Sequence, residues 1–232
     1  MKILAVDAST NVAGCAVLSE EKLIAEDLVN YKLKHSEKLM PAISSVMASS
    51  GLAYGDLDAL AVTVGPGSFT GLRIGIAAVK GICQASGKQV IPVSTLEALA
   101  YNLLYTKGIV CPLLDARRQQ VYTALFRTDG NGNIQRLTED CALEPEKLNA
   151  LLADYSETVY LMGDGVPAYG GLLMQDAGQE HPRLVVKPYQ ALGHAASVAA
   201  CAQDHPERMI DFHVLEPVYL RPSYAEEKKC RG

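Results

Sequence analysis

The sequence predicts an α/β protein built from two related halves. Three observations carry this expectation. An apolar strand pattern ends in Asp-Ala twice, at Asp7-Ala8 and at Asp115-Ala116. Each is followed by a returning strand with alternating apolar residues and then by helical and strand patterns in similar order. A glycine-rich turn, residues 65–75, joins a strand to a helix in the first copy. The repeat indicates a duplicated domain, with halves 1–106 and 107–232 and a ligand cleft between them.

The first half has a regular order of predicted elements. Strands over 2–6, 14–18 and 22–30 form a meander. A helix over 36–50 follows, with Pro41 near its start, and then a strand over 59–64. The glycine turn leads into a helix that stops at Gly87. A strand over 89–93 and a helix over 95–105 complete the half, and Ser94 caps that helix with Glu97 in a capping box.

The second half repeats this order more loosely. Strands are expected over 109–116, 120–127 and 134–138, with a hairpin turn over 129–133. A helix over 145–155, a strand over 158–162, a turn over 163–165 and a helix over 192–203 follow. Two prolines and two tyrosines predict an ordered, extended tail over 217–226, and residues 227–232 are expected to be frayed.

Composition limits the function classes. The chain has 232 residues, 49% of them hydrophobic, and a formal net charge of −5, which argues against unaided, nonspecific binding of nucleic acid. The six cysteines form no Cys-x-x-Cys pair, so buried free thiols in a reducing compartment are expected rather than disulfides or zinc. No apolar run approaches the ~20 residues of a membrane span. A soluble, cytoplasmic protein without membrane contact is predicted.

The glycine turn has two open interpretations. Glycine allows positive φ and close approach of a ligand or of a neighbouring chain, and Ser68 or Thr70 can cap the following helix. Free N–H groups there would suit an anion, and Arg73 would strengthen that preference. Alternatively, the glycines only permit tight packing. The spacing matches neither a P-loop nor a dinucleotide fingerprint.

The end of the first strand also leaves two alternatives. Asp7, Ser9 and Thr10 are residue types that hold a phosphate and its magnesium. The same residues can instead hydrogen-bond their own turn.

Several motifs together resemble the TsaB (YeaZ) family. They are Ile3–Thr10, His35–Pro41, Gly65–Gly75, Val93–Leu99, Leu114–Arg117 and Tyr219–Pro222. The resemblance implies the actin, sugar-kinase and Hsp70 fold, with two ribonuclease-H-like halves. It also implies the noncatalytic subunit of the bacterial machinery that makes threonylcarbamoyladenosine beside the anticodon of tRNA, working with a TsaD-like catalytic subunit and a TsaE-like ATPase.

The resemblance implies two sites on this chain. The helix after the first meander would dock the TsaD-like subunit and would pair with a second copy when the chain is alone. Its predicted interface residues are His35, Ser36, Leu39, Met40, Ile43 and Met47. A nucleotide such as ATP or ADP could lodge at the subunit junction. The candidate residues of that loop are Asp7, Ser9, Thr10, Gly65, Gly67, Ser68, Thr70, Gly71 and Arg73.

Comparison with the catalytic relative predicts a pseudoenzyme. TsaD carries His-Leu-Glu-x-His, whose two imidazoles on one helix face bind a metal. The matching stretch here is Thr95-Leu96-Glu97-Ala98-Leu99, and the five histidines contain no i, i+4 pair. Kinases of this fold usually have glycine where Ala8 stands, which disfavours nucleotide binding by this chain alone. No catalytic residue, metal or resident cofactor is therefore expected. The resemblance makes tRNA an indirect partner, through the complex, and leaves open whether tRNA also contacts this subunit.

Two enzyme hypotheses compete with this prediction. An independent ATPase or phosphotransferase would use Asp7, Asp115 and the glycine turn. A peptidase is disfavoured because Ser68 lies in Pro-x-Ser-x-Thr and not in a Gly-x-Ser-x-Gly elbow.

Overall fold

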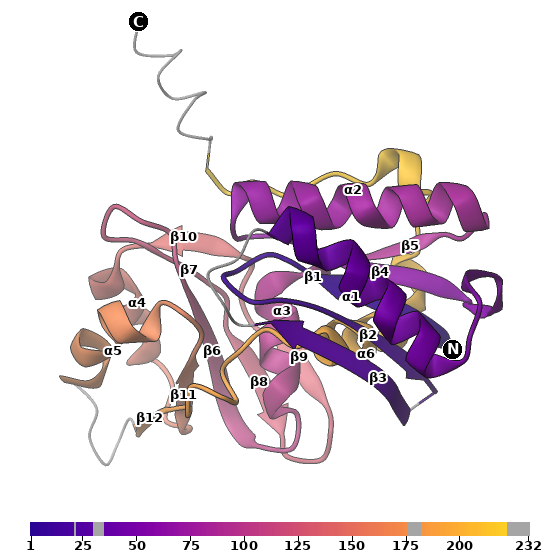
Figure 1. The fold of residues 1–232 in the computed structure, drawn as a ribbon. Coiled ribbons are helices and arrows are strands. Elements are labelled where there is room, and N and C mark those ends of the chain that lie inside the picture. The colour runs from indigo at the N-terminus through magenta and orange to yellow at the C-terminus, as the bar shows by residue number, and fades with distance from the viewer. Residues whose placement is uncertain (21, 30–34, 176–181, 222–232) are drawn as a thin grey trace, which may run out of the picture.

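The first half is organised around a mixed five-stranded sheet. The computed structural model describes residues 1–20, 22–29, 35–175 and 182–221. The strand order is β3-β2-β1-β4-β5 (Figure 1). Strands β1 and β2 pair antiparallel, whereas β1, β4 and β5 run parallel. The strands are β1 (Lys2–Asp7), β2 (Ala13–Ser19), β3 (Lys22–Val29), β4 (Ala59–Gly65) and β5 (Val90–Ser94).

The second sheet repeats this order and these directions. Its main path is β10-β7-β6-β11-β12, with β7 antiparallel to β6 and with β11 and β12 parallel to it. Two further strands, β8 and β9, pair beside β6. The repeated order confirms the predicted duplication and places Asp7 and Asp115 at equivalent strand ends. The strands are β6 (Lys107–Asp115), β7 (Val121–Thr123), β8 (Phe126–Asp129), β9 (Ile134–Arg136), β10 (Cys141–Leu143), β11 (Val159–Met162) and β12 (Arg183–Val185).

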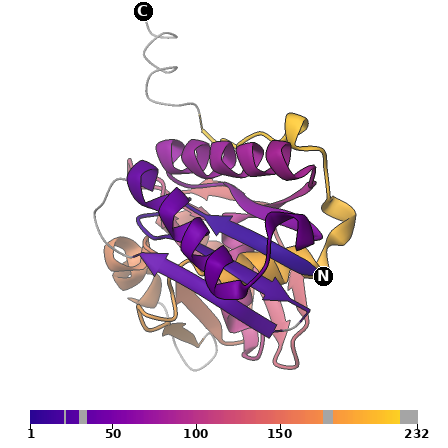
Figure 2. The same ribbon diagram turned by 45° about the vertical axis from the view of Figure 1, so that its right-hand side comes forward.

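Helices cover both sheets. On the first sheet, α1 and α2 pack on one face and α6 on the other (Figures 1 and 2). Helix α3 contacts both sheets, with Ala98 in the core of the first and Leu96 and Leu99 in the core of the second, whose other face is covered by α4 and α5. The helices are α1 (His35–Ser50), α2 (Phe69–Ser86), α3 (Thr95–Ala100), α4 (Pro145–Leu152), α5 (Val166–Gln175) and α6 (Ala195–Asp204). No helix in the described part of the chain is long and apolar enough to span a bilayer.

Strand β1 is buried on both faces, which explains its uninterrupted apolar sequence. Leu4 and Val6 pack toward α1 and α2, whereas Ile3 and Ala5 pack toward α6. This is the alternation that a period of two requires. A central strand with two covered faces gives a continuous apolar run, and that run is why the strand could be predicted.

Most predicted elements are present, and the differences lie mainly in the second half. The strand expected over 120–127 is interrupted, because β7 and β8 pair with different parts of β6. Strands β10 and β12 and helix α5 were not predicted. The three-residue strands are too short to show periodicity, and the glycines at positions 170 and 171 mask the helix. Residues 222–232, with part of the predicted tail, lie outside the described residues.

The boundary expected at 106 and 107 separates the two sheets. The half 107–232, however, does not pack as one unit. Helix α6 buries Val198, Cys201 and Ala202 against the first sheet, and Leu215 belongs to the same core as α1 and α2. The chain therefore returns to the first half after β12, because the second face of the first sheet must be covered.

Candidate functional site

A polar cleft of about 360 Å³ lies where the two halves meet. Its walls are the ends of β1 and β6 together with the two turns that follow β4 and β11. The fold thus brings together the two strand ends that the sequence repeat had marked. The lining residues are Ser9, Thr10, Asn11, Gly67, Ser68, Leu114, Asp115, Ala116, Arg117, Tyr122 and Asp164.

Asp7 lies beneath this cleft and holds the local backbone. It is 2% exposed. Its Oδ1 atom accepts hydrogen bonds from the Ser9 N–H at 2.9 Å, the Ser9 hydroxyl at 2.6 Å and the Thr63 hydroxyl at 2.8 Å. Thr10 likewise bonds within its own turn, to the Val12 N–H at 3.1 Å. Of the two alternatives for this strand end, the observed contacts are those of the hydrogen-bonded turn.

The glycine turn packs directly on the backbone after β1. A Cβ on Gly67 would lie 2.2 Å from the Ser9 carbonyl oxygen, and one on Gly71 would lie 2.0 Å from that of Ala8. The Ser68 N–H donates to the Ser9 oxygen at 2.6 Å, and the Ser68 hydroxyl accepts from the Gly71 N–H at 3.2 Å. The Ser68 and Gly71 N–H groups are therefore satisfied within the protein, and the carbonyl oxygens of Ala8 and Ser9 lie against the turn.

The backbone of Gly65 lies close to the backbone of the C-terminal segment that contains Val218. A Cβ on Gly65 would lie 2.4 Å from the Val218 carbonyl oxygen, and the φ of Gly65, +128°, favours glycine. The remaining candidates of the turn, Thr70 and Arg73, are exposed at the start of α2.

Carboxylates dominate the second wall of the cleft. Burial raises the pKa of Asp164, and the nearby charge of Asp115 adds to this effect, although the Asp115 N–H donates to Asp164 and opposes it. Asp115 forms an ion pair with Arg117 at 3.0 Å. Two neighbouring acidic side chains repel a polyphosphate unless a cation lies between them. The geometry therefore does not favour a nucleotide held by this chain alone.

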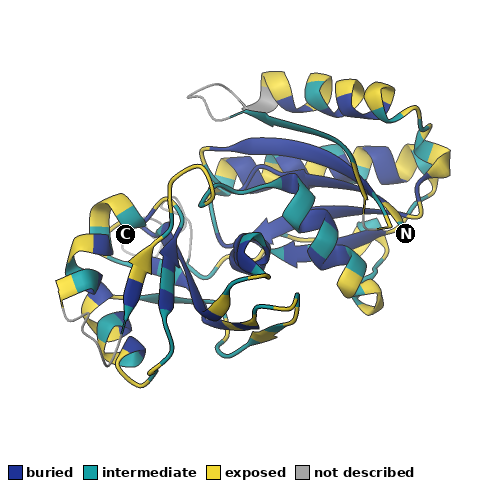
Figure 3. Ribbon diagram, turned by 90° about the horizontal axis from the view of Figure 1, so that it is seen from below, coloured by how far each residue is buried: buried dark blue, intermediate teal, exposed yellow. Residues whose placement is uncertain are grey.

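The structure changes the prediction for the interface helix α1. Leu39, Ile43 and Met47, expected to be apolar contacts for a partner, are 3%, 0% and 4% exposed and belong to the first core. That part of the prediction is wrong, because the apolar stripe faces the sheet. Met40 is 43% exposed, and Figure 3 shows that the outer side of α1 as a whole is exposed. The side chains of His35 and Ser36 lie outside the described residues.

An apolar groove of about 700 Å³ runs beside α1 and along α2. The exposed ridge of α2 carries Ala77, Gly81 and Ala85 at i, i+4 and i+8, and all three line the groove. Met40 and Tyr54 close its other side. Such small residues let another helix approach closely. This spacing is visible in the sequence, whereas the resemblance places the interface on the helix over 36–50 alone.

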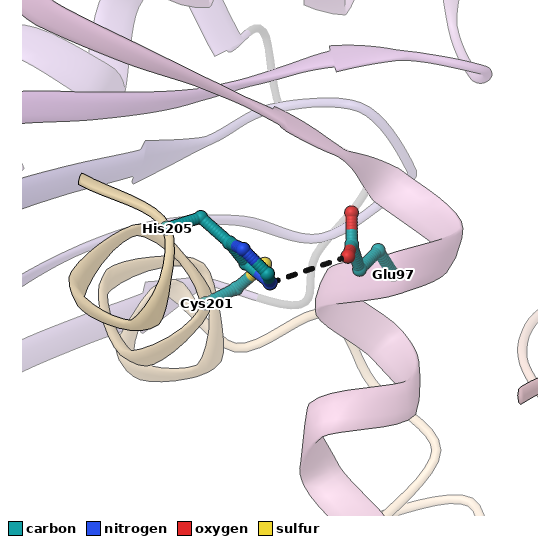
Figure 4. Close-up of side chains that lie close together, drawn as sticks. All are labelled: Glu97, Cys201 and His205. Atoms are coloured by element: carbon teal, nitrogen blue, oxygen red, sulfur yellow. Dashed lines mark ion pairs between the residues drawn. The ribbon is translucent and has the colours of Figure 1, made fainter. Parts of the chain in front are cut away.

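Glu97 is the centre of a buried ion-pair cluster that the sequence reasoning missed. Arg208 contacts both of its carboxylate oxygens, at 2.8 and 3.2 Å, and Arg136 contacts one at 3.2 Å. Cys201 and His205 also lie close (Figure 4). Burial raises the pKa of Glu97, but the two arginines outweigh this and hold it below its usual range.

This cluster does not fit a metal ion. Glu97, Cys201 and His205 have suitable donor atoms within 4.8 Å of one another. The two guanidinium groups already occupy the carboxylate, however, and would repel a cation. Burial also raises the pKa of the Cys201 thiol, which opposes the thiolate that a metal requires. The cluster instead ties α3 to β9 and to the segment after α6.

Comparisons with known proteins agree with this architecture. The model of the family "TsaD: tRNA N6-adenosine threonylcarbamoyltransferase" matches residues 29–228. A Bacillus subtilis protein named "tRNA threonylcarbamoyladenosine biosynthesis protein TsaB" is 33% identical, and the match covers 98% of this chain and 97% of the relative.

Two solved structures extend the comparison. A Pseudomonas aeruginosa protein, described as similar to peptidase YeaZ, superposes with a TM-score of 0.80 at 26% identity, over 95% of this chain and 99% of that one. A ROK hexokinase from Thermus thermophilus superposes with a TM-score of 0.51 at 14% identity, over 88% of this chain and 100% of that one. The second likeness shows the shared sugar-kinase type of fold and nothing about activity.

Proposed function

Because the chain belongs to the TsaB family, whose members are named for tRNA threonylcarbamoyladenosine biosynthesis, we propose that it is the noncatalytic partner of a TsaD-like subunit. In this role it binds and activates the catalytic subunit, which acts with a TsaE-like ATPase to transfer threonylcarbamoyl to the adenosine beside the anticodon. The chain supplies a binding surface for the catalytic subunit and contributes no catalytic residue.

Two places in the fold support a noncatalytic role. Thr95 and Leu99 stand where the catalytic relative's motif has its two histidines, and they are 1% and 2% exposed. Neither provides an imidazole, and Glu97 between them is neutralised by arginines. In the cleft, the Ser68 N–H of the glycine turn donates to the Ser9 carbonyl oxygen and the Gly71 N–H donates to the Ser68 hydroxyl, so neither is open to an anion.

The single observation that best supports a docking role is the groove between α1 and α2. This groove of about 700 Å³ is exposed and mainly apolar, and the small-residue ridge of α2 lines it. A TsaD-like partner is the proposed occupant because the TsaD family model also matches this chain, so both subunits would offer an equivalent helix pair. The same pseudo-symmetric contact would let two copies of this chain pair when no partner is present.

Light scattering after size-exclusion chromatography tests this surface. Gly81→Arg places a large charged side chain in the groove, and a Cβ at this position meets nothing within 4 Å, so the fold tolerates it. Gly171→Arg in α5 is the matched control, also helical and also with nothing within 4 Å. We expect both wild type and Gly171→Arg to form a homodimer alone and a heterocomplex with the TsaD-like subunit. Gly81→Arg should lose both. Unchanged binding by Gly81→Arg would refute the assignment of the groove.

ATP or ADP is proposed to bind at the junction of the two subunits rather than to this chain alone. Equilibrium binding of a labelled nucleotide to the chain, to the TsaD-like subunit and to their complex separates these possibilities. Binding by the isolated chain, with ATP hydrolysis abolished by Asp7→Asn, would favour the alternative of an independent ATPase or phosphotransferase.

A further inference from the structure

Phe69, Arg73 and Tyr219 form a compact group at the start of α2, and Arg221 lines the same small recess as Phe69 and Tyr219; the four residues are here called the Arg-aromatic cluster. The rings of Phe69 and Tyr219 stack with centroids 4.8 Å apart and planes at 26°. The Arg73 guanidinium lies 3.9 Å above the Phe69 ring, and its Nε donates to the Tyr219 hydroxyl at 2.9 Å. These contacts fix the orientation of Arg73 before any ligand arrives.

The cluster has positive charge that nothing in the described part of the chain neutralises. Among the described residues, Arg73 and Arg221 have no carboxylate within ion-pair distance, whereas Arg117, Arg127, Arg136 and Arg208 each have at least one. Arg221 donates to the Ala116 carbonyl oxygen at 3.2 Å and keeps further N–H donors. Two guanidinium groups that no described carboxylate pairs with, on a protein of net negative charge, are an anion-binding arrangement.

The surroundings favour a planar ligand that also carries phosphate. A small recess of about 90 Å³, lined by Pro66, Phe69, Tyr122 and the tail from Val218 to Arg221, adjoins the cluster. Tyr219 is 37% exposed. Aromatic faces beside arginines are the combination by which proteins hold single-stranded nucleic acid, with bases on the rings and phosphates on the guanidinium groups.

We propose that the Arg-aromatic cluster is a contact site for tRNA, which stacks an unpaired nucleobase beside Tyr219 and binds backbone phosphate at Arg73 and Arg221. This rests on the proposed function, which brings tRNA to the complex. Because the chain has a net charge of −5, the site adds to the tRNA affinity of the catalytic subunit and does not bind RNA independently.

The test measures tRNA affinity of the complex as a function of salt. Wild-type chain is assembled with the TsaD-like subunit, and the Kd for the unmodified substrate tRNA is measured by fluorescence anisotropy at several salt concentrations. Removing one phosphate contact lowers the salt slope by about 0.9 and raises Kd ~5-fold near physiological salt. We expect this change for Arg73→Gln and again for Arg221→Gln.

Two further variants make the result specific. Arg127→Gln removes the same charge from β8, where Arg127 pairs with Glu157, and should leave Kd and slope unchanged. Tyr219→Phe keeps the ring and the charge but removes the hydroxyl that orients Arg73. It should raise Kd less than Arg73→Gln does and leave the salt slope unaltered.

Three outcomes would overturn the inference. One is an unchanged Kd and slope in the Arg73→Gln, Arg221→Gln double variant. Another is loss of the complex in the double variant, which would make the cluster a protein contact. A third is weakened ATP binding with unchanged tRNA binding, which would assign the cluster to a free nucleotide. Light scattering on the same samples reports complex formation separately, so the proposed function can stand while this inference fails.

Discussion

Replacing Gly71 by alanine should destabilise the chain although alanine is the better helix former. Gly71 lies in the first turn of α2, and its added Cβ would stand 2.0 Å from the Ala8 carbonyl oxygen. Contacts under 3.0 Å are essentially never observed, so α2 must move away from the end of β1 by about an ångström. That movement also stretches the bond from the Ser68 N–H to the Ser9 oxygen, now 2.6 Å.

The magnitude follows from three contributions. Overpacking costs ~1–3 kcal/mol, a weakened backbone hydrogen bond costs ~1 kcal/mol, and alanine in a helix returns ~1 kcal/mol. We therefore expect a net loss of about 1–3 kcal/mol in the free energy of unfolding. For a chain of this size, that lowers Tm by ~2–12 °C.

Gly81→Ala supplies the matched control on the same helix. Nothing lies within 4 Å of its added Cβ. It should stabilise the chain by about 0.5–1 kcal/mol through helix propensity alone. Both variants are compared by urea unfolding followed by circular dichroism, at two protein concentrations so that self-association is recognised. Equal stability of Gly71→Ala and wild type would refute the close-packing account of the glycine turn.

Three more predictions follow from buried polar groups. Glu97→Gln should cost ~2–4 kcal/mol at pH 7, because its arginine partners lose their counter-charge. Because the pKa of Glu97 is lowered in the folded chain, its ion pairs stabilise the fold above about pH 4.5, and this stability is lost as the pH falls through the lowered pKa. In unfolding experiments at decreasing pH, the free energies of unfolding of Glu97→Gln and wild type should therefore converge. Asp7→Ala should cost ~2–4 kcal/mol by leaving three donors unsatisfied, with unfolding in urea as the measurement. Burial raises the pKa of Cys15 to about 12, of Cys83 to about 11 and of Cys111 to about 12, so alkylation at pH 8 followed by mass spectrometry should modify these thiols only in denaturant. Rapid modification in the native chain would contradict this.

The parts of the fold that sequence reasoning predicted well are those where one physical requirement dominates. Strand β1 is buried on both faces, so its apolar run has one interpretation. Ser68 and Gly87 mark the two ends of α2: Ser68 accepts from the Gly71 N–H, and Gly87 adopts φ 69°. The equivalent strand ends at Asp7 and Asp115 followed from the internal repeat, and they meet at one cleft.

The failures have physical causes too. The apolar residues of α1 are predicted to contact a partner, but the apolar face of an amphipathic helix packs on the sheet of its own chain. Ile43, at 0% exposure, shows this directly. The cluster around Glu97 joins residues separated by more than a hundred positions in the sequence, such as Arg208, and no local pattern reveals such a pairing.

The most direct test of the central claim is the rate of threonylcarbamoyl transfer to substrate tRNA, measured with the TsaD-like and TsaE-like subunits in the presence and absence of this chain. If the chain is the activating partner, the rate of transfer should fall to near background when the chain is omitted. Gly171→Arg should then restore the rate, whereas Gly81→Arg should not. Transfer at the full rate without the chain would contradict the account.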